Sequence, residues 1–196
     1  MTKTARKDGR NLRAERSRAA VANAALELIR AGNPRPTAAE IAETAGVSLR
    51  LVFHHYKDVD ALRGRAVALQ FSRVLPLETA ATTDLPFDKR LNTFTKERFA
   101  LYNEIADVLR VARAMESSVD EVAEQLQELR ALTRKQAAEV FAPELTSFKG
   151  AERRERTTAV QVATSFGTWE SLVMHHELPE NRAIKAVRWM IRQSVE

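Results

Sequence analysis

Cysteine is absent from this chain, and glycine and proline each occur only six times in 196 residues. The lack of cysteine excludes a disulfide framework, a cysteine nucleophile and a thiolate metal site. No apolar run approaches the length that spans a bilayer, and no apolar stretch follows the basic N-terminus as it does in a signal peptide. We therefore predict a cytoplasmic protein without a membrane partner.

The apolar residues recur every three or four positions rather than every two, which is the spacing of helices. Together with the few glycines and prolines, this spacing predicts an all-α protein. The expected helices cover about residues 13–31, 37–45, 48–56, 58–75, 88–103, 104–116, 119–141, 151–177 and 181–194.

Positive charge is concentrated in the first 75 residues, which carry 14 Lys and Arg against 7 Asp and Glu, whereas the remainder carries 17 against 19. A basic segment attracts polyanions, although a solvated basic surface has the same composition. Residues 1–12 lack apolar periodicity and are expected to form a flexible basic arm. Its candidate phosphate or minor-groove contacts are Lys3, Arg6, Lys7 and Arg10, and they act more as plain electrostatics than as specific readers.

Local sequence features delimit two short helices between Thr37 and Tyr56. Thr37-Ala-Ala-Glu40 is a capping box, in which the hydroxyl and the carboxylate satisfy backbone donors at a helix start. Gly46 provides a turn, and Ser48 is placed to cap the next helix. Ser118-Val-Asp-Glu121 is a second capping box, expected before the helix over residues 119–141.

Two short helices joined by a tight turn have the proportions of a helix-turn-helix, whose second helix enters the DNA major groove with its N-terminus first. Burial of Val52 and Phe53 would turn the neighbouring side chains toward the groove, where Arg50 could make a bidentate contact to guanine. The candidate DNA contacts are Arg13, Thr37, Ser48, Leu49, Arg50, Leu51, His54, His55 and Lys57.

The stretch Ile41-Ala-Glu-Thr-Ala-Gly-Val-Ser48, followed by Phe53, His55-Tyr56 and Leu62, resembles the signature of the TetR/AcrR transcriptional regulators. The resemblance covers about residues 13–65. It implies an N-terminal three-helix DNA-binding domain, over residues 13–57, and a larger helical domain for effector binding and dimerisation, over residues 58–196. Two positions depart from the pattern, because the family usually has Tyr where this chain has Phe53 and commonly has Lys where it has Val59.

A dimer is expected because one recognition helix contacts few bases, whereas two related by a twofold axis read a palindromic operator on double-stranded DNA. The apolar stripes of the last two predicted helices suit a four-helix bundle between two subunits, although they would also suit the monomer's own core. The candidate interface residues are Phe166, Trp169, Leu172, Val173, Val187, Met190 and Ile191.

An unknown small-molecule effector is expected to bind among the middle helices. The candidate pocket residues are Phe94, Phe99, Tyr102, Met115, Phe141, Met174 and His175, with His176 beside them. Apolar residues at helical spacing are, however, more often core than ligand wall. With only four histidines and no cysteine, neither a metal nor another cofactor is predicted.

Enzymatic motifs are missing, since the chain has no glycine-rich phosphate loop, no G-x-S-x-G and no H-E-x-x-H. We therefore predict a non-enzymatic, sequence-specific regulator, a repressor that an effector releases from its operator. Two alternatives stay open at this point: an activator, or a dimeric ligand-binding or interaction protein of the same fold with weakened operator reading.

Overall fold

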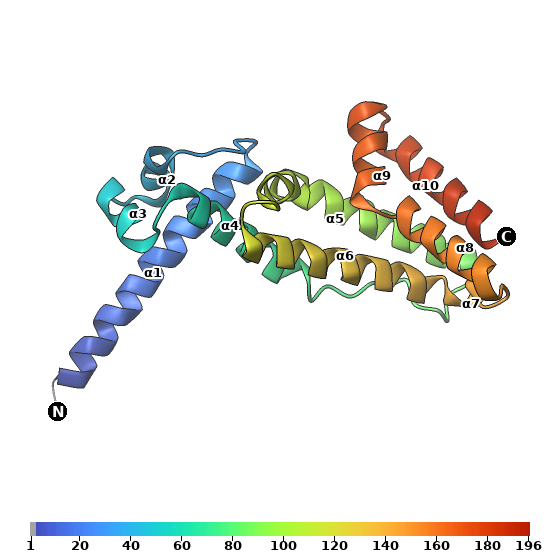
Figure 1. Cartoon of the computed structure of the whole chain (residues 1–196), viewed down its shortest axis with the longest axis horizontal. Helices are drawn as coiled ribbons and strands as arrows, with labels where there is room; N and C mark the ends of the chain where they lie inside the picture. Colours follow the sequence, from blue (N-terminus) through green and yellow to red (C-terminus); the bar gives the residue numbers. More distant parts are fainter. Residues whose placement is uncertain (1–2) are drawn as a thin grey trace. The chain divides into compact units, whose positions relative to one another are not determined.

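The computed structural model describes the backbone of residues 3–196 and the side chains of residues 14–196, and these residues form helices and no strand (Figure 1). This confirms the predicted all-α class. The described part of the chain divides into two compact units. Unit 1 contains residues 1–74 and 105–126, and unit 2 contains residues 75–104 and 127–196. No described helix combines the length and the apolar character needed to cross a bilayer.

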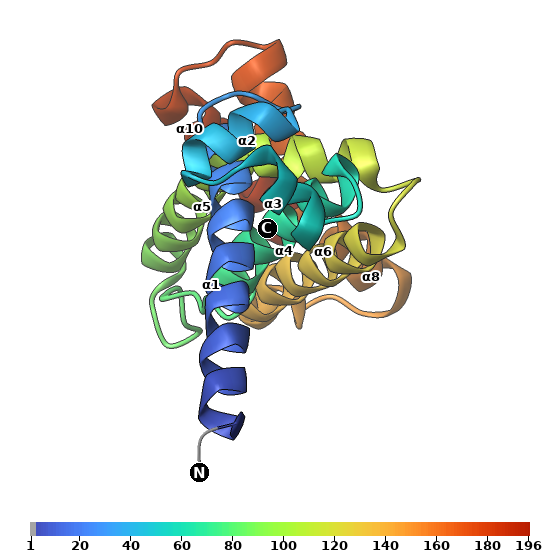
Figure 2. The same ribbon diagram turned by 90° about the vertical axis from the view of Figure 1, so that its left-hand side faces the viewer.

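Unit 1 is built on α1 (Lys3–Arg30), which packs against α2 (Ala38–Ala45) and α4 (Val59–Val74). The short α3 (Leu49–His55) follows α2 and packs on it. Figure 2 shows α1 running upward from the N-terminus toward α2. The helices share one core, which contains the fully buried Val21, Ala25, Ile29, Ile41 and Leu62. The short α3 therefore packs on a well-ordered base.

The first helix begins at Lys3 and not near Arg13, so the backbone of residues 3–12 is helical where an arm without regular structure was expected. The lack of apolar periodicity in residues 3–12 shows only that this segment has no apolar side to pack against other helices. Its Ala, Lys and Arg residues are good helix formers, and they extend a helix that begins to be anchored at Val21. Residues 1–2 of the predicted arm lie outside the described residues.

The middle of the chain forms α5 (Phe87–Met115) and α6 (Asp120–Val140). The predicted break between residues 103 and 104 is wrong, because nothing there stops a helix and Asn103 instead bonds other helices. Its Oδ1 accepts from Trp169 Nε1 at 3.1 Å, and its Nδ2 donates to Glu180 Oε2 at 2.9 Å. The predicted cap at Ser118 is also wrong, since its hydroxyl donates to the Met115 carbonyl oxygen at 3.1 Å.

The C-terminal part of unit 2 consists of α7 (Ala142–Leu145), α8 (Gly150–Ala163), α9 (Phe166–Glu170), the π-helical turn η1 (Ser171–His175) and α10 (Glu180–Val195). The single helix predicted over residues 151–177 is broken at Thr164–Ser165. There the Ser165 hydroxyl accepts from the Thr168 backbone N–H at 3.2 Å and starts α9. Serine at a helix start satisfies a backbone donor that otherwise lacks a partner.

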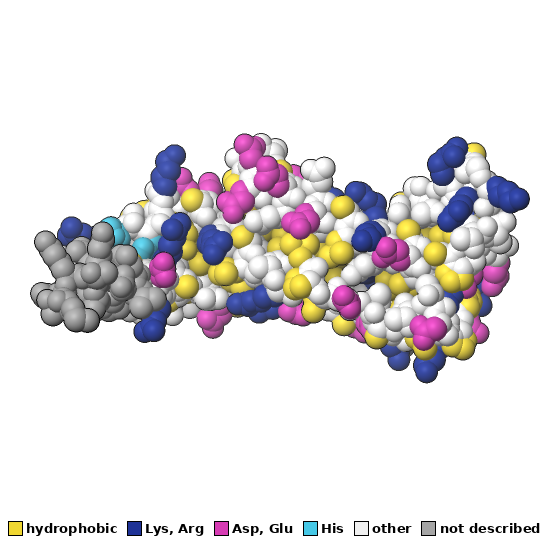
Figure 3. Space-filling view, turned by 90° about the horizontal axis from the view of Figure 1, so that it is seen from below, with side chains coloured by type: hydrophobic (Ala, Val, Ile, Leu, Met, Phe, Trp, Pro, Cys, Tyr) yellow, Lys and Arg dark blue, Asp and Glu magenta, His cyan; other side chains and the backbone are white. Residues whose placement is uncertain are grey.

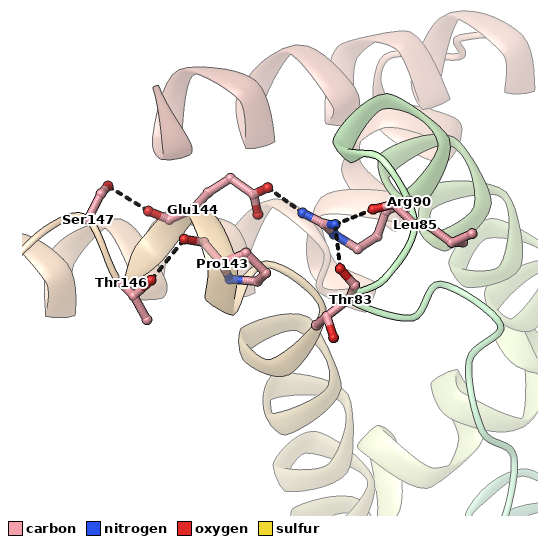
Figure 4. A network of polar contacts seen from close by, with 7 residues as sticks. All are labelled: Thr83, Leu85, Arg90, Pro143, Glu144, Thr146 and Ser147. Carbon is pink, nitrogen blue, oxygen red and sulfur yellow. Dashed lines mark hydrogen bonds and ion pairs between the residues drawn. The ribbon is translucent and has the colours of Figure 1, made fainter.

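A buried arginine fixes one end of unit 2 (Figure 4). Arg90, on α5, is 2 % exposed and forms an ion pair with Glu144 of α7. Its other terminal nitrogen donates to the carbonyl oxygens of Leu85 and Thr83, at 2.6 and 3.4 Å. The pair thus holds the loop before α5 against α7, and loss of one partner would leave a buried charge uncompensated.

Candidate nucleic-acid interface

Both ends of α2 are formed as the local sequence predicts. The Thr37 backbone N–H donates to Glu40 Oε2 at 2.7 Å, and the Glu40 backbone N–H donates to the Thr37 hydroxyl at 3.3 Å, which completes the capping box. The hydrogen bonds from the Thr37 backbone and hydroxyl lower the pKa of the Glu40 carboxyl. Gly46 has φ of 65°, a left-handed conformation that glycine adopts without strain.

Helix α3 is fixed at both ends. Ser48 accepts from the Leu51 backbone N–H at 3.3 Å, which confirms the predicted cap. At the other end the Tyr56 hydroxyl donates to the Arg18 carbonyl oxygen at 3.0 Å, and the Arg18 guanidinium carbon lies 5.4 Å from the centre of the Tyr56 ring. These contacts set the direction of α3 relative to α1.

His55 adds a second contact between α3 and α1. Its Nε2 lies 2.6 Å from Ser17 Oγ, and the Ser17 hydroxyl donates to the Ala14 carbonyl oxygen at 3.0 Å. Burial, followed by the charges of His54 and Arg18, lowers the pKa of His55. Half-buried His55 therefore acts mainly as a tether within unit 1.

The outward face of α3 is formed by Leu49, Arg50, Phe53 and His54, with Lys57 just beyond its end. Leu49 is 46 % exposed and Phe53 is 51 % exposed. The expected burial of Phe53 is wrong, because only Val52 of this helix turns fully into the core. Phe53 follows Leu49 by four positions and Arg50 by three, so helical periodicity alone could have placed it on the outward face.

The other predicted DNA contacts surround this face or lie outside the described side chains. Thr37 and Ser48 are exposed, whereas Leu51 is half-buried. Arg13 and the basic residues before it belong to the part of α1 whose side chains are not described. Figure 3 shows histidine side chains beside Lys and Arg at the end of the view that holds α3. The face thus combines positive charge with exposed apolar groups.

Neither of the two described hollows of unit 2 contains all the predicted effector residues. Phe94 and Phe141 pack edge to face in the core of unit 2, with ring centres 5.5 Å apart. Met115 belongs to unit 1, where its methyl group lies 3.9 Å from the Cβ position of Gly64. Met174 and His175 are exposed on η1. The sequence pattern could not distinguish core residues from residues that line a ligand pocket, because both recur at the same helical spacing.

Two hollows do lie in unit 2. A cavity of about 10 Å³, beside Phe99 and Tyr102, has room for roughly one water molecule. A recess of about 300 Å³ lies against the segment before α5 and includes Phe94 among its walls. Sequence reasoning missed the recess, although Arg98 interrupts an otherwise apolar stripe of α5 and could have drawn attention to it.

The predicted interface residues fall into two groups. Trp169, Val187 and Ile191 are 4 %, 3 % and 0 % exposed and belong to the core of unit 2, so they offer no surface to a partner subunit. For these three residues the apolar stripe closes the monomer's own core, which was the alternative to a dimer interface. The half-buried residues are Phe166, Leu172, Val173 and Met190. Trp189, which was not among the candidates, is 63 % exposed.

The whole architecture is similar to solved helical structures. A proposed transcriptional regulator from Pseudomonas aeruginosa PAO1 matches with a TM-score of 0.63 and 18 % identity, over 91 % of this chain and 90 % of that one. A proposed fatty acid metabolism regulator from Clostridium perfringens matches with a TM-score of 0.55 and 13 % identity, over 90 % and 98 %. At these identities the likeness shows the fold. No protein-family model and no curated protein sequence matches the chain.

Proposed function

We propose that this protein is a sequence-specific transcriptional regulator of the TetR/AcrR kind, a repressor that a small-molecule effector releases from a palindromic operator. The observation that carries the proposal is the outward face of α3, held between the Ser48 cap and the Tyr56 contact with Arg18. The sequence resemblance supports the same function, and the similar structures, which are described as regulators, support a regulatory role. No catalytic role is proposed.

The residues of this face would have different roles when α3 enters the major groove. Arg50 is exposed and can donate two hydrogen bonds to guanine, while Leu49 can contact thymine methyl groups. Thr37, Lys57 and the basic residues at the start of α1 would contact phosphates, which adds affinity that falls with salt.

Dimerisation through η1 and α10 would place two such faces on one operator. The exposed Trp189 is the strongest candidate for an anchor, and the half-buried Leu172, Val173 and Met190 on the same two elements are further candidates. Large aromatic residues commonly supply most of the binding free energy of an interface. In this proposal residues 1–57 bind DNA, and the rest of the chain binds the effector and the second subunit.

The proposal is tested by selecting an operator from random duplexes and measuring its affinity for Arg50→Ala. We expect a loss of about 1–3 kcal/mol on the selected operator and relaxed preference at one base pair. Arg153→Ala removes the same charge from exposed α8 and is the matched control, which should leave the specificity ratio unchanged. Equal affinity of the unaltered protein for every duplex would refute the proposal.

A second candidate function follows from Phe53, whose exposed ring lacks the hydroxyl that the family usually presents there. A dimeric ligand-binding or interaction protein with weakened operator reading would tolerate this loss. Phe53→Tyr restores a phosphate donor and should strengthen operator binding by about 0.5–1.5 kcal/mol if α3 contacts DNA. No change would favour the second candidate.

A further inference from the structure

The recess of unit 2 is formed by residues 77–79 together with side chains of α5 and α6. A chain of hydrogen bonds runs through its lining, since Arg98 Nη2 donates to Gln136 Oε1 at 3.1 Å and Gln136 Nε2 donates to the Leu77 carbonyl oxygen at 3.0 Å. This chain holds the segment before α5 against α6. The recess is therefore preformed.

Much of the lining is apolar, with contributions from Leu77, Phe94, Ala100 and Leu101. A volume of about 300 Å³ is at the small end of ligand pockets, which span roughly 300–1,000 Å³. Such pockets combine apolar walls with a few polar groups that orient the ligand. The space therefore suits a small molecule with an apolar body.

Arg98 is the buried polar side chain of this lining whose hydrogen-bonding capacity is incompletely used. It is 5 % exposed, and its guanidinium carbon lies 4.9 Å from the centre of the Phe94 ring. Nη2 is bonded to Gln136, whereas Nη1 is buried without a hydrogen-bond partner. A buried donor without a partner costs free energy, and the cost is larger for a charged group. An acceptor oxygen supplied by a ligand would remove this cost.

The carboxylates of the lining restrict which molecule can supply that oxygen. Glu97 accepts from the Thr79 hydroxyl at 2.6 Å and from the Ala80 backbone N–H at 3.2 Å. Glu104 also has a partner already, so neither carboxylate awaits a ligand cation. Together with Glu78 they nevertheless disfavour an anion, while the guanidinium disfavours a cation. An uncharged ligand avoids both repulsions.

We propose that this recess binds a small uncharged carbonyl compound. Its apolar body lies against Leu77, Phe94 and Leu101, and its carbonyl oxygen accepts a hydrogen bond from Arg98 Nη1. Because Nη1 is buried, the guanidinium rotates about the bonds of its flexible side chain to meet the oxygen. That this compound is the effector that releases DNA rests on the regulator function proposed above.

Binding is tested by calorimetry on the full-length protein without DNA, with benzylacetone, phenylpropylamine and phenylpropanoate as probes at neutral pH. The three molecules share an apolar body and differ in charge. The uncharged ketone benzylacetone should bind tightest. Both charged probes should bind at least about tenfold more weakly, because like charges brought together at a binding site are strongly unfavourable. The proposal is overturned if either charged probe binds as tightly as benzylacetone or more tightly.

Arg98→Met retains a long side chain but removes its donors and its charge. Benzylacetone should then bind about tenfold more weakly, because a hydrogen bond to a charged group is among the stronger ones. Phenylpropylamine should bind more tightly than to the unaltered protein, since the opposing guanidinium is gone. Unchanged benzylacetone binding would show that Arg98 is not the donor and would refute the proposal.

Arg188→Met is the matched control for this variant. Arg188 Nε donates to the Thr95 hydroxyl of α5 at 2.9 Å, but Arg188 is not part of the recess lining. The substitution removes the same charge from the same unit. It should change neither the benzylacetone nor the phenylpropylamine affinity.

Ala100→Phe locates the ligand without altering Arg98. Ala100 is an exposed position of the lining, so the larger ring fills the recess and should abolish benzylacetone binding with an unchanged melting temperature. Ala159→Phe, the same change at an exposed position of α8, is the control and should bind normally. Undiminished binding by Ala100→Phe would place the ligand elsewhere and overturn the proposal. If Arg98→Met does not fold, the probe series and Ala100→Phe decide it.

The regulatory step is tested separately by adding benzylacetone to the protein–operator complex. Reduced operator affinity supports the effector role, and unchanged affinity at saturating benzylacetone overturns that role while the calorimetry still decides the recess. If the protein selects no operator at all, the regulator function fails, and the calorimetric result is unaffected because DNA takes no part in it.

Discussion

The Tyr56 hydroxyl donates to the backbone carbonyl oxygen of Arg18 at 3.0 Å, and this bond, together with the His55–Ser17 contact, links the end of α3 to α1. Tyr56→Phe keeps the buried ring and removes the donor. We expect the free energy of unfolding to fall by about 1 kcal/mol and operator affinity to fall with it, because α3 becomes less well oriented.

Tyr102→Phe is the matched control for this prediction. The Tyr102 hydroxyl donates to the Thr164 carbonyl oxygen at 3.0 Å, also from a buried ring, but it lies in unit 2. Denaturant titration should show a similar loss of stability in both variants. Only Tyr56→Phe should weaken DNA binding, and equal operator affinities would contradict the orienting role.

Alanine substitutions at two glycines of unit 1 are expected to change the free energy of unfolding in opposite directions. Gly46 has φ of 65° and open space around its Cβ position, so Gly46→Ala should cost about 1 kcal/mol through the left-handed backbone alone. Gly64 lies within α4, where a Cβ would meet Val122 Cγ2 at an ordinary 3.6 Å. Gly64→Ala should therefore stabilise by about 0.5–1 kcal/mol through helix propensity. Thermal unfolding of the two variants measures both signs, and a stabilising Gly46→Ala would contradict the turn geometry.

The His55 pKa is lowered from its ordinary value of 6.5, chiefly by burial. The folded state therefore binds its proton more weakly than the unfolded state. The contribution of His55 to the free energy of unfolding is fully present above pH 6.5. It is lost as the pH falls through the lower pKa of the folded state. Unfolding measured across this window should show a pH slope that is smaller in His55→Gln, whose amide can still form a hydrogen bond with Ser17. Identical slopes in both proteins would show that His55 does not contribute.

In the proposed dimer, Trp189 is expected to be an anchor because it is 63 % exposed on α10. Trp189→Ala should weaken dimerisation by about 2 kcal/mol or more, as for a central aromatic residue of an interface. Sedimentation equilibrium measures the dissociation constant. Leu77→Ala, which removes a side chain that is 51 % exposed elsewhere in unit 2, should leave it unchanged.

Short-range chemistry made the helix-turn-helix predictable. The Thr37 box, the Gly46 turn and the Ser48 cap each depend on residues at most three positions apart, and all three are formed. Asp58 caps the start of α4 through the same short-range chemistry, since its Oδ1 accepts from the Ala61 backbone N–H at 2.7 Å.

Features that depend on tertiary packing were harder to predict from the sequence. Met115 and Phe141 carry the apolar character of a pocket wall but pack in the cores of different units. Thr164 and Ser165 end one helix and start another in a stretch whose apolar periodicity continues through them. Periodicity gives the face of a residue, and only the tertiary arrangement decides what covers that face.

The recognition helix has seven residues and only one of them, Val52, is buried. Two turns of helix are too short to persist alone in water, so α3 exists by virtue of its contacts with the rest of unit 1. Local opening of this segment and loss of the outward face of α3 are then the same event. A bound operator should slow amide hydrogen exchange most strongly in α3, since a ligand that binds only the closed form stabilises it by mass action. If α3 reads DNA as proposed, operator binding is thermodynamically coupled to the formation of this helix.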